Sequence, residues 1–106
     1  MAAQSDTPVF DLLQSMTADS FEASSLDQRT TMLVRIAALV AVGAPPASYL
    51  LNLGAAGESG IDEDEIRGVL AAVAPVVGTA RVASAASNIA RAGLAMLAEL
   101  EAEAEE

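Results

Sequence analysis

The 106-residue chain contains no cysteine, no histidine and no lysine. The absence of cysteine excludes disulfides and thiolate nucleophiles, and the absence of histidine excludes imidazole acid–base catalysis and the usual zinc sites. Without lysine there is neither a Schiff base nor the lysine of a phosphate-binding P-loop. Any catalysis would therefore rest on carboxylates, hydroxyls, amides, arginine or the single tyrosine.

Aromatic residues make up only 3% of the chain, namely Phe10, Phe21 and Tyr49, although 53% of the residues are hydrophobic. The core must therefore consist of small and aliphatic side chains, which favours closely packed helices over a sheet rich in β-branched and aromatic residues. A chain of this length supports one core. We predict an all-α fold of about five helices in a single compact domain.

Positive charge is scarce: five residues are basic, all of them arginine, against 15 acidic ones, and the net charge is -10. Neutralising phosphates requires a basic face, so we expect no nucleic-acid partner. The acidic run from Asp62 to Glu65 lacks the glycine and the ligand spacing of an EF-hand loop, and a helix start explains it. We therefore expect no metal and no other cofactor.

Long hydrophobic runs are also missing. The most apolar stretch, 36–53, is broken by Gly43 and by Pro45–Pro46, and falls short of the roughly 20 residues that a membrane span requires. The start, MAAQSDTPVFD, has no basic segment before an apolar one, so we expect no signal peptide and a cytoplasmic location. A mean hydropathy of +0.42 in so short a chain predicts that apolar surface is buried between subunits.

Residues that typically start or end helices divide the first half of the chain into three expected helices. The first begins with Thr7 as N-cap and is followed by a polar interval, 17–25. The second opens at Ser25, with a capping box, and ends at Gly43. The third is short and covers 46–56, because proline favours its first turn and glycines follow it.

The second half contains two further expected helices. Asp62 and Glu65 have the spacing of a capping box, and Pro75 should kink or end the helix that they start. A long last helix follows Thr79, with a heptad-like seam of Val82, Ala86, Ile89, Gly93, Met96 and Leu100. This seam fits either a contact between subunits or packing on its own domain. We place the domain at 1–98 and an acidic C-terminal tail at 99–106.

Three segments resemble the carboxymuconolactone decarboxylase-like family, which includes the alkyl hydroperoxidase D-like proteins. They are LDQRTTMLVRIAALVAVG at 26–43, AAGESGIDEDEIRGVLAAVAPVVGTAR at 55–81, and PVFDLLQSMTADSF at 8–21. The resemblance covers residues 8–98 and consists of diffuse helical patterns. It implies an all-α fold and assembly into trimers or hexamers.

The reactive residues of that family are missing. The resemblance implies a Cys-x-x-Cys at the start of the third helix, a His four residues later and a relay Glu on the preceding helix. Counting forward from Leu26 places the first three at Ala44, Ala47 and Leu51, with Met32 at the Glu position. Counting backward from Gly60 and Ile66 places them at Pro45, Ser48 and Asn52. Thiol peroxidase chemistry is therefore excluded, and the decarboxylating branch also relies on the His.

Three residues of the third helix are candidates for ligand binding. Ser48 and Asn52 lie one helical turn apart and could hydrogen-bond a ligand; the alternative is that they satisfy the local backbone or water. Tyr49 could act as a phenolic acid, but we expect it in the core with a hydrated hydroxyl.

Two arginines complete the candidate set. Arg35 interrupts an aliphatic run, so we expect it to pair with a carboxylate, from Glu22, Asp27 or a neighbouring subunit, or else to reach the surface; anion binding is a further alternative. The resemblance puts Arg81 near the pocket of the third helix, although a surface ion pair is the simpler expectation.

We interpret the chain as a homo-oligomeric structural or ligand-binding protein with a degenerate active site. The partner is another copy of itself, and a small acidic ligand is a candidate. One alternative is an enzyme of unrecognised type that uses Ser48, Asn52, Arg35 and Arg81. Another is a small helical adaptor for a different protein.

Overall fold

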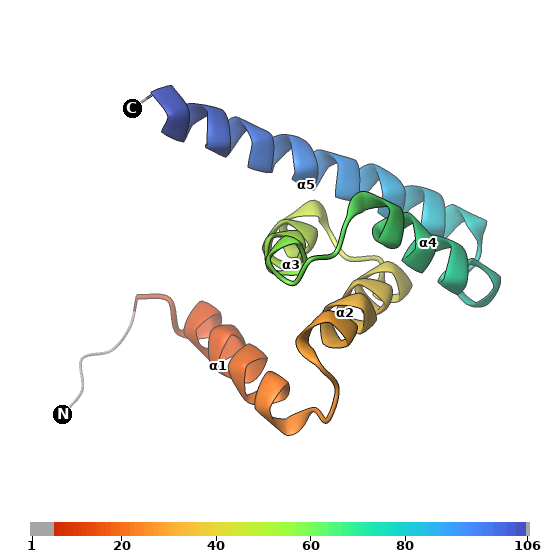
Figure 1. Ribbon diagram of the computed structural model, residues 1–106, viewed down its shortest axis with the longest axis horizontal. Helices are drawn as coiled ribbons and strands as arrows, with labels where there is room; N and C mark the ends of the chain where they lie inside the picture. Colours follow the sequence, from red (N-terminus) through yellow and green to blue (C-terminus); the bar gives the residue numbers. More distant parts are fainter. Residues whose placement is uncertain (1–5, 106) are drawn as a thin grey trace.

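Five helices form the chain in the computed structural model, which describes residues 6–105 and the side chains of residues 6–98, 101 and 102. They are α1 (Pro8–Ala23), α2 (Gln28–Val42), α3 (Pro46–Glu58), α4 (Glu63–Val77) and α5 (Thr79–Glu105) (Figure 1). The described residues contain no strand, so the predicted all-α domain is confirmed. None of the helices in this part of the chain is long and apolar enough to cross a membrane.

Helices α2 to α5 pack against one another, whereas α1 lies to one side of this body (Figure 1). The radius of gyration is 15.4 Å. A compact domain of this length has a radius of about 13 Å. The difference reflects the separate position of α1 and the length of α5, which together leave much apolar surface without intramolecular cover.

The core consists of two adjoining clusters. In the first, Met32 and Ile36 of α2 meet Ala56 of α3 and the isoleucines that flank the start of α4, Ile61 and Ile66. The second joins the end of α2 to α3 and α5 and contains Val40, Ala44, Tyr49, Ala85 and Ala92. Alanines dominate the α5 side, which lets this helix approach α3 closely.

Several predicted helix ends are confirmed. Thr7 is the N-cap of α1, and Gly43 ends α2 with φ +71°, a conformation that glycine adopts without strain. Asp62 and Glu65 form the predicted capping box at the start of α4, in which the Asp62 carboxylate accepts from the Glu65 backbone N–H at 2.9 Å.

Other predicted ends are wrong. Helix α1 continues to Ala23, through most of the polar interval expected to follow it. Asp27, not Ser25, caps α2, and its carboxylate accepts from the Thr30 N–H at 2.7 Å. Helix α4 continues through Pro75 to Val77, so Pro75 does not end the helix near Ala74.

The structure also differs from the predicted end of α3 and from the predicted seam of α5. Helix α3 runs two residues past Ala56, to Glu58. Val82 and Ile89 of the seam do pack on the core, but the small residues beside them are Ala85 and Ala92, each one position before those predicted. Helix α5 is continuous through the proposed tail to Glu105. The side chain of Leu100 lies outside the described residues.

Candidate functional site

The connection between α2 and α3 is where the family resemblance places the cysteines. Gly43 turns the chain, and the prolines that follow start α3, with Pro45 as N-cap and Pro46 in the first turn. Ala44 is 5% exposed and belongs to the core. The first cysteine position of the resemblance is therefore a buried methyl group in the forward register, Ala44, and the exposed Pro45 in the backward register.

Two side chains of α5 hold this connection in place. Arg81 Nη1 donates to the Ala41 carbonyl at the end of α2 at 2.5 Å, and Asn88 Nδ2 donates to the Ala44 carbonyl at 3.2 Å. The Arg81 guanidinium lies against Gly43, 3.8 Å from where a Cβ would be. Arg81 has no ion pair among the described residues, in contrast to the expectation; its guanidinium instead binds the C-terminus of α2, where a cation is favourable.

Asn88 is a structural residue that the sequence analysis missed. It follows Arg81 by seven residues, or two helical turns, so both side chains lie on the same face of α5. That spacing is the signal that could have identified the pair. Together the two donors hold the connection between α2 and α3 against α5.

Ser48 and Asn52 are joined by a hydrogen bond inside α3. Asn52 Nδ2 donates to the Ser48 backbone carbonyl at 2.8 Å, and both residues are half-buried. One donor of the Asn52 amide is thus used locally, which is the alternative to ligand binding that the sequence left open.

Tyr49 is fully buried, with 0% of its surface exposed. The expected core position is confirmed, and the hydroxyl is shielded from bulk solvent with no hydrogen-bond partner among the described protein residues. Desolvation by this burial raises the pKa of Tyr49 above its ordinary value. The phenol is therefore protonated at neutral pH, and the core encloses its hydroxyl.

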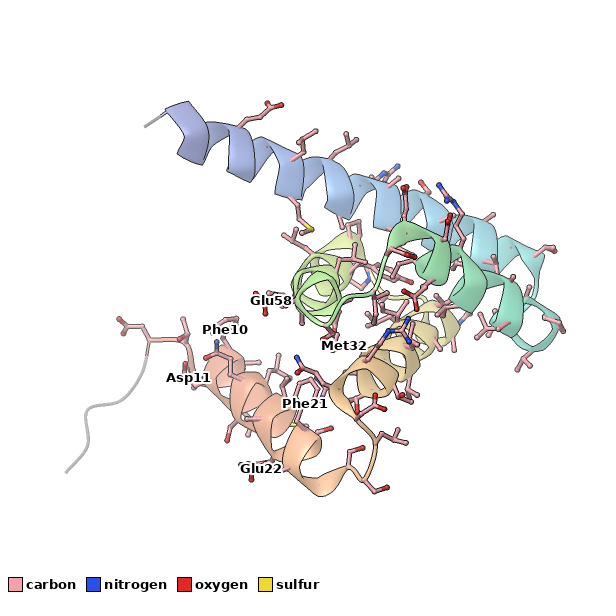
Figure 2. All side chains as sticks on the ribbon, in the orientation of Figure 1. Phe10, Asp11, Phe21, Glu22, Met32 and Glu58 are labelled. Carbon is pink, nitrogen blue, oxygen red and sulfur yellow. The ribbon has the colours of Figure 1, made fainter. Side chains whose placement is uncertain are left out.

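Arg35 binds α1 instead of a carboxylate. Its Nη2 donates to the Thr17 carbonyl at 3.2 Å and to Ser20 Oγ at 3.0 Å. The guanidinium lies 4.0 Å from the centre of the Phe21 ring, in a cation–π arrangement. The predicted pairing with Glu22 or Asp27 is wrong. Figure 2 shows why for Glu22, which points away from the body while Phe21 faces it.

A cleft of about 440 Å³ separates α1 from α3. Its walls are mostly apolar and include Phe10, Leu13, Thr17, Ala18, Phe21 and Leu51. Leu51, which one register of the resemblance places at the family's histidine, is 68% exposed. Arg35 contacts Thr17 and Phe21 of this wall, so a cation lies next to the cleft. We call it the α1–α3 cleft.

The five candidate residues do not share one cleft. Arg35 bonds to α1 and Arg81 to the end of α2, and neither lines the α1–α3 cleft. Ser48, Tyr49 and Asn52 share α3 but do not line that cleft either.

The acidic residues at the start of α4 are engaged with arginines. Glu65 forms an ion pair with Arg29 of α2, and Arg67 lies 3.3 Å from Glu63 and 2.7 Å from Asp64. Together with the capping box, these pairs account for the run that the sequence analysis assigned to a helix start.

The comparisons with known proteins give one match. The model of the carboxymuconolactone decarboxylase family matches residues 7–92, which is most of the chain. No curated protein and no solved structure matches this chain. The matched range starts at the N-cap of α1 and ends in the middle of α5, so it includes both core clusters and the α1–α3 cleft.

Proposed function

Because the chain belongs to the carboxymuconolactone decarboxylase family, we propose that it is a non-catalytic member that acts as a homo-oligomeric structural or binding protein in the cytoplasm. The surface of α1 carries the proposal. Val9, Leu12, Leu13 and Met16 expose between 54% and 69% of their surface. Burying each such side chain is worth about 1.5–3 kcal/mol, so a neighbouring subunit that covers α1 is strongly favoured.

Light scattering coupled to size exclusion tests the assembly. We expect a mass that is a small integer multiple of the 10.7 kDa chain, three or six by the family resemblance. Replacing Leu12 and Met16 by glutamine should shift the mass toward one chain while the circular dichroism stays helical, because neither residue belongs to the core. Ser15→Gln, on the polar side of α1, is the matched control. A wild-type mass near that of one chain would refute the assembly and favour the adaptor.

The residues at the family's reactive positions support the absence of catalysis. Either register puts a residue without a thiol at each cysteine position, and Met32, at the relay position, is fully buried among aliphatic side chains. We expect no consumption of organic hydroperoxide in the presence of a thiol reductant, and no decarboxylation of a muconolactone, after metal removal. Turnover in either assay that scales with the purified protein would overturn the proposal.

One observation favours binding of a small amphipathic acid as a second function. Among the described residues Arg35 has no carboxylate partner, and it stacks on Phe21, a wall of the apolar α1–α3 cleft. A cation beside an apolar cleft is complementary to a carboxylate with a short alkyl chain.

Calorimetric titration with octanoate, and with octanol as the uncharged control, tests this second function. We expect octanoate to bind more tightly than octanol, and Arg35→Gln to abolish the difference between the two. Equal affinity for both compounds, or no heat with either, would contradict an acid site in the cleft.

A further inference from the structure

Helix α1 is anchored to the body at one end. At the end of α1, Phe21 packs against the first core cluster and stacks on Arg35, which also bonds to α1. At the start of α1, Phe10 lines the α1–α3 cleft but is 48% exposed. None of the extensive helix–helix contacts in the described part of the chain involves α1. The cation beside the cleft thus lies at the anchored end, and exposed apolar surface continues toward the start of α1.

The cleft carries no negative charge of its own. The chain has 15 acidic residues and a net charge of -10, yet none of the described residues that line the cleft is acidic. Glu22, which follows Phe21 directly, points away from the body (Figure 2). An anion that enters the cleft therefore meets apolar walls and a neighbouring cation, with no carboxylate in the lining to repel it.

Arg35 retains hydrogen-bond donors for such an anion. A guanidinium has N–H groups on three nitrogens. In Arg35 the hydrogen bonds with described residues come from Nη2 alone, to the Thr17 carbonyl and to Ser20 Oγ, so Nε and Nη1 have no partner in that part of the chain. An N–H of a guanidinium forms a charge-assisted hydrogen bond with a carboxylate. A carboxylate can therefore bind Arg35 without breaking the contacts that hold α1.

The length of the cleft along α1 limits the size of the ligand. Phe10 and Phe21 mark its two ends on this helix (Figure 2), and eleven residues at 1.5 Å per residue span about 16 Å. Arg35 contacts α1 between Thr17 and Phe21, so the path from the cation to Phe10 is about 10–16 Å long. An extended alkyl chain advances about 1.3 Å per carbon, and about 8 to 12 carbons therefore span this path.

We propose that the α1–α3 cleft binds a medium-chain fatty acid in one orientation, with its carboxylate at Arg35 and its alkyl chain running toward Phe10. The proposal rests on the acid site proposed above and specifies its ligand class. The alkyl chain covers Leu13 and Leu51, which expose 54% and 68% of their surface on the two walls of the cleft. Removing this apolar surface from water favours binding, and each added methylene contributes until the chain passes Phe10.

A chain-length series tests the ligand class. Hexanoate, octanoate, decanoate, dodecanoate and tetradecanoate are titrated into the protein by calorimetry, each below its critical micelle concentration. We expect the affinity to rise by up to about fourfold per methylene as far as dodecanoate. Tetradecanoate should bind no more tightly, because its end extends past Phe10 into water. Equal affinity across the series, or a rise that continues unchanged to tetradecanoate, would overturn the proposal.

Three variants test the orientation. Phe10→Ala removes the apolar end of the cleft, and Arg35→Gln removes the cation at the other end. Val76→Ala, which truncates an exposed apolar side chain on α4 outside the cleft, is the matched control. We expect Phe10→Ala to weaken dodecanoate binding by about tenfold and to leave hexanoate binding unchanged. Arg35→Gln should weaken both acids by the same factor, and Val76→Ala should weaken neither.

The outcomes separate this proposal from the acid site on which it rests. A Phe10→Ala variant that loses hexanoate and dodecanoate binding equally would overturn the orientation, because a structural role for Phe10 acts on both acids alike. The preference for octanoate over octanol would then still support the acid site. Equal affinity of the wild type for octanoate and octanol would refute the acid site and this proposal together.

Discussion

Replacing Tyr49 by phenylalanine should stabilise the protein. The hydroxyl of Tyr49 is fully buried and has no partner among the described protein residues, so folding removes it from bulk water without a protein hydrogen bond in return. An unsatisfied buried polar group of this kind costs about 1–3 kcal/mol. The small void left by the oxygen reduces the gain, and we expect Tyr49→Phe to raise the free energy of unfolding by about 1 kcal/mol.

The same substitution should change the response to alkali. The pKa of Tyr49 is raised by desolvation above its value of 10.0 in the unfolded chain. Above pH 10 the unfolded state therefore loses the phenolic proton while the folded state keeps it. Stability is unaffected below pH 10 and then falls by about 1.4 kcal/mol per pH unit until the folded pKa is reached. Tyr49→Phe should show no such fall.

The composition makes this experiment unusually specific. Tyr49 is the only tyrosine, and the chain has no cysteine and no lysine, so it is the only side chain expected to titrate between about pH 9 and 11.5. Urea unfolding followed by circular dichroism, at equal chain concentration and at pH 8, 10 and 11, gives the stabilities. Tyrosinate absorbance gives the folded pKa.

Two results would refute the reasoning about Tyr49. A loss of 1 kcal/mol or more in Tyr49→Phe at pH 8 would show that the hydroxyl makes a hydrogen bond. An absorbance titration of the folded protein with a midpoint at or below 10 would show that the phenol is hydrated.

Three further substitutions test other parts of the structure by urea unfolding. Gly43→Ala should cost about 1 kcal/mol because φ is +71°, whereas Gly68→Ala, in the middle of a helix and in open space, should stabilise by up to about 1 kcal/mol; equal effects would contradict the assignment. Met32→Ala should cost about 2–5 kcal/mol and Val34→Ala, 52% exposed, under about 1 kcal/mol. The hydrogen bonds that the Asp27 carboxylate accepts at the start of α2 lower its pKa below 3.8, so the stabilisation by this cap is present above pH 3.8 and is lost as the pH falls through the folded pKa. The stability of Asp27→Ala should therefore be less acid-sensitive than that of the wild type. An unchanged acid profile would argue against the cap.

The features predicted correctly from the sequence are those with local causes. A capping box at Asp62, a left-handed glycine at Gly43 and a proline in the first turn of a helix depend on residues within one turn, so their spacing suffices. The all-α class follows equally well from a composition rich in alanine and poor in aromatics. The family match supports the same fold.

The end of α1 and the partners of Arg35 and Arg81, which differ from the predictions, depend on contacts distant in the sequence. Helix α1 runs on to Ala23 because Phe21 packs against the first core cluster and Arg35 binds Thr17 and Ser20, partners 18 and 15 residues away. The sequence contains several carboxylates that could pair with Arg35, but nothing in it predicts that the partners are a backbone carbonyl, a serine hydroxyl and an aromatic ring. Likewise the role of Arg81 depends on a carbonyl 40 residues away.

A glutamate at the position of Met32 would not suit the interior of this chain. The resemblance assigns the relay carboxylate to this position, which is fully buried in contact with Ile36, Ala56, Ile61 and Ile66. A glutamate there would be a buried carboxylate without a cationic partner, at a cost of several kcal/mol, or would remain protonated. A carboxylate at this position and the present core packing would therefore compete for the same volume, which Met32 fills in this chain.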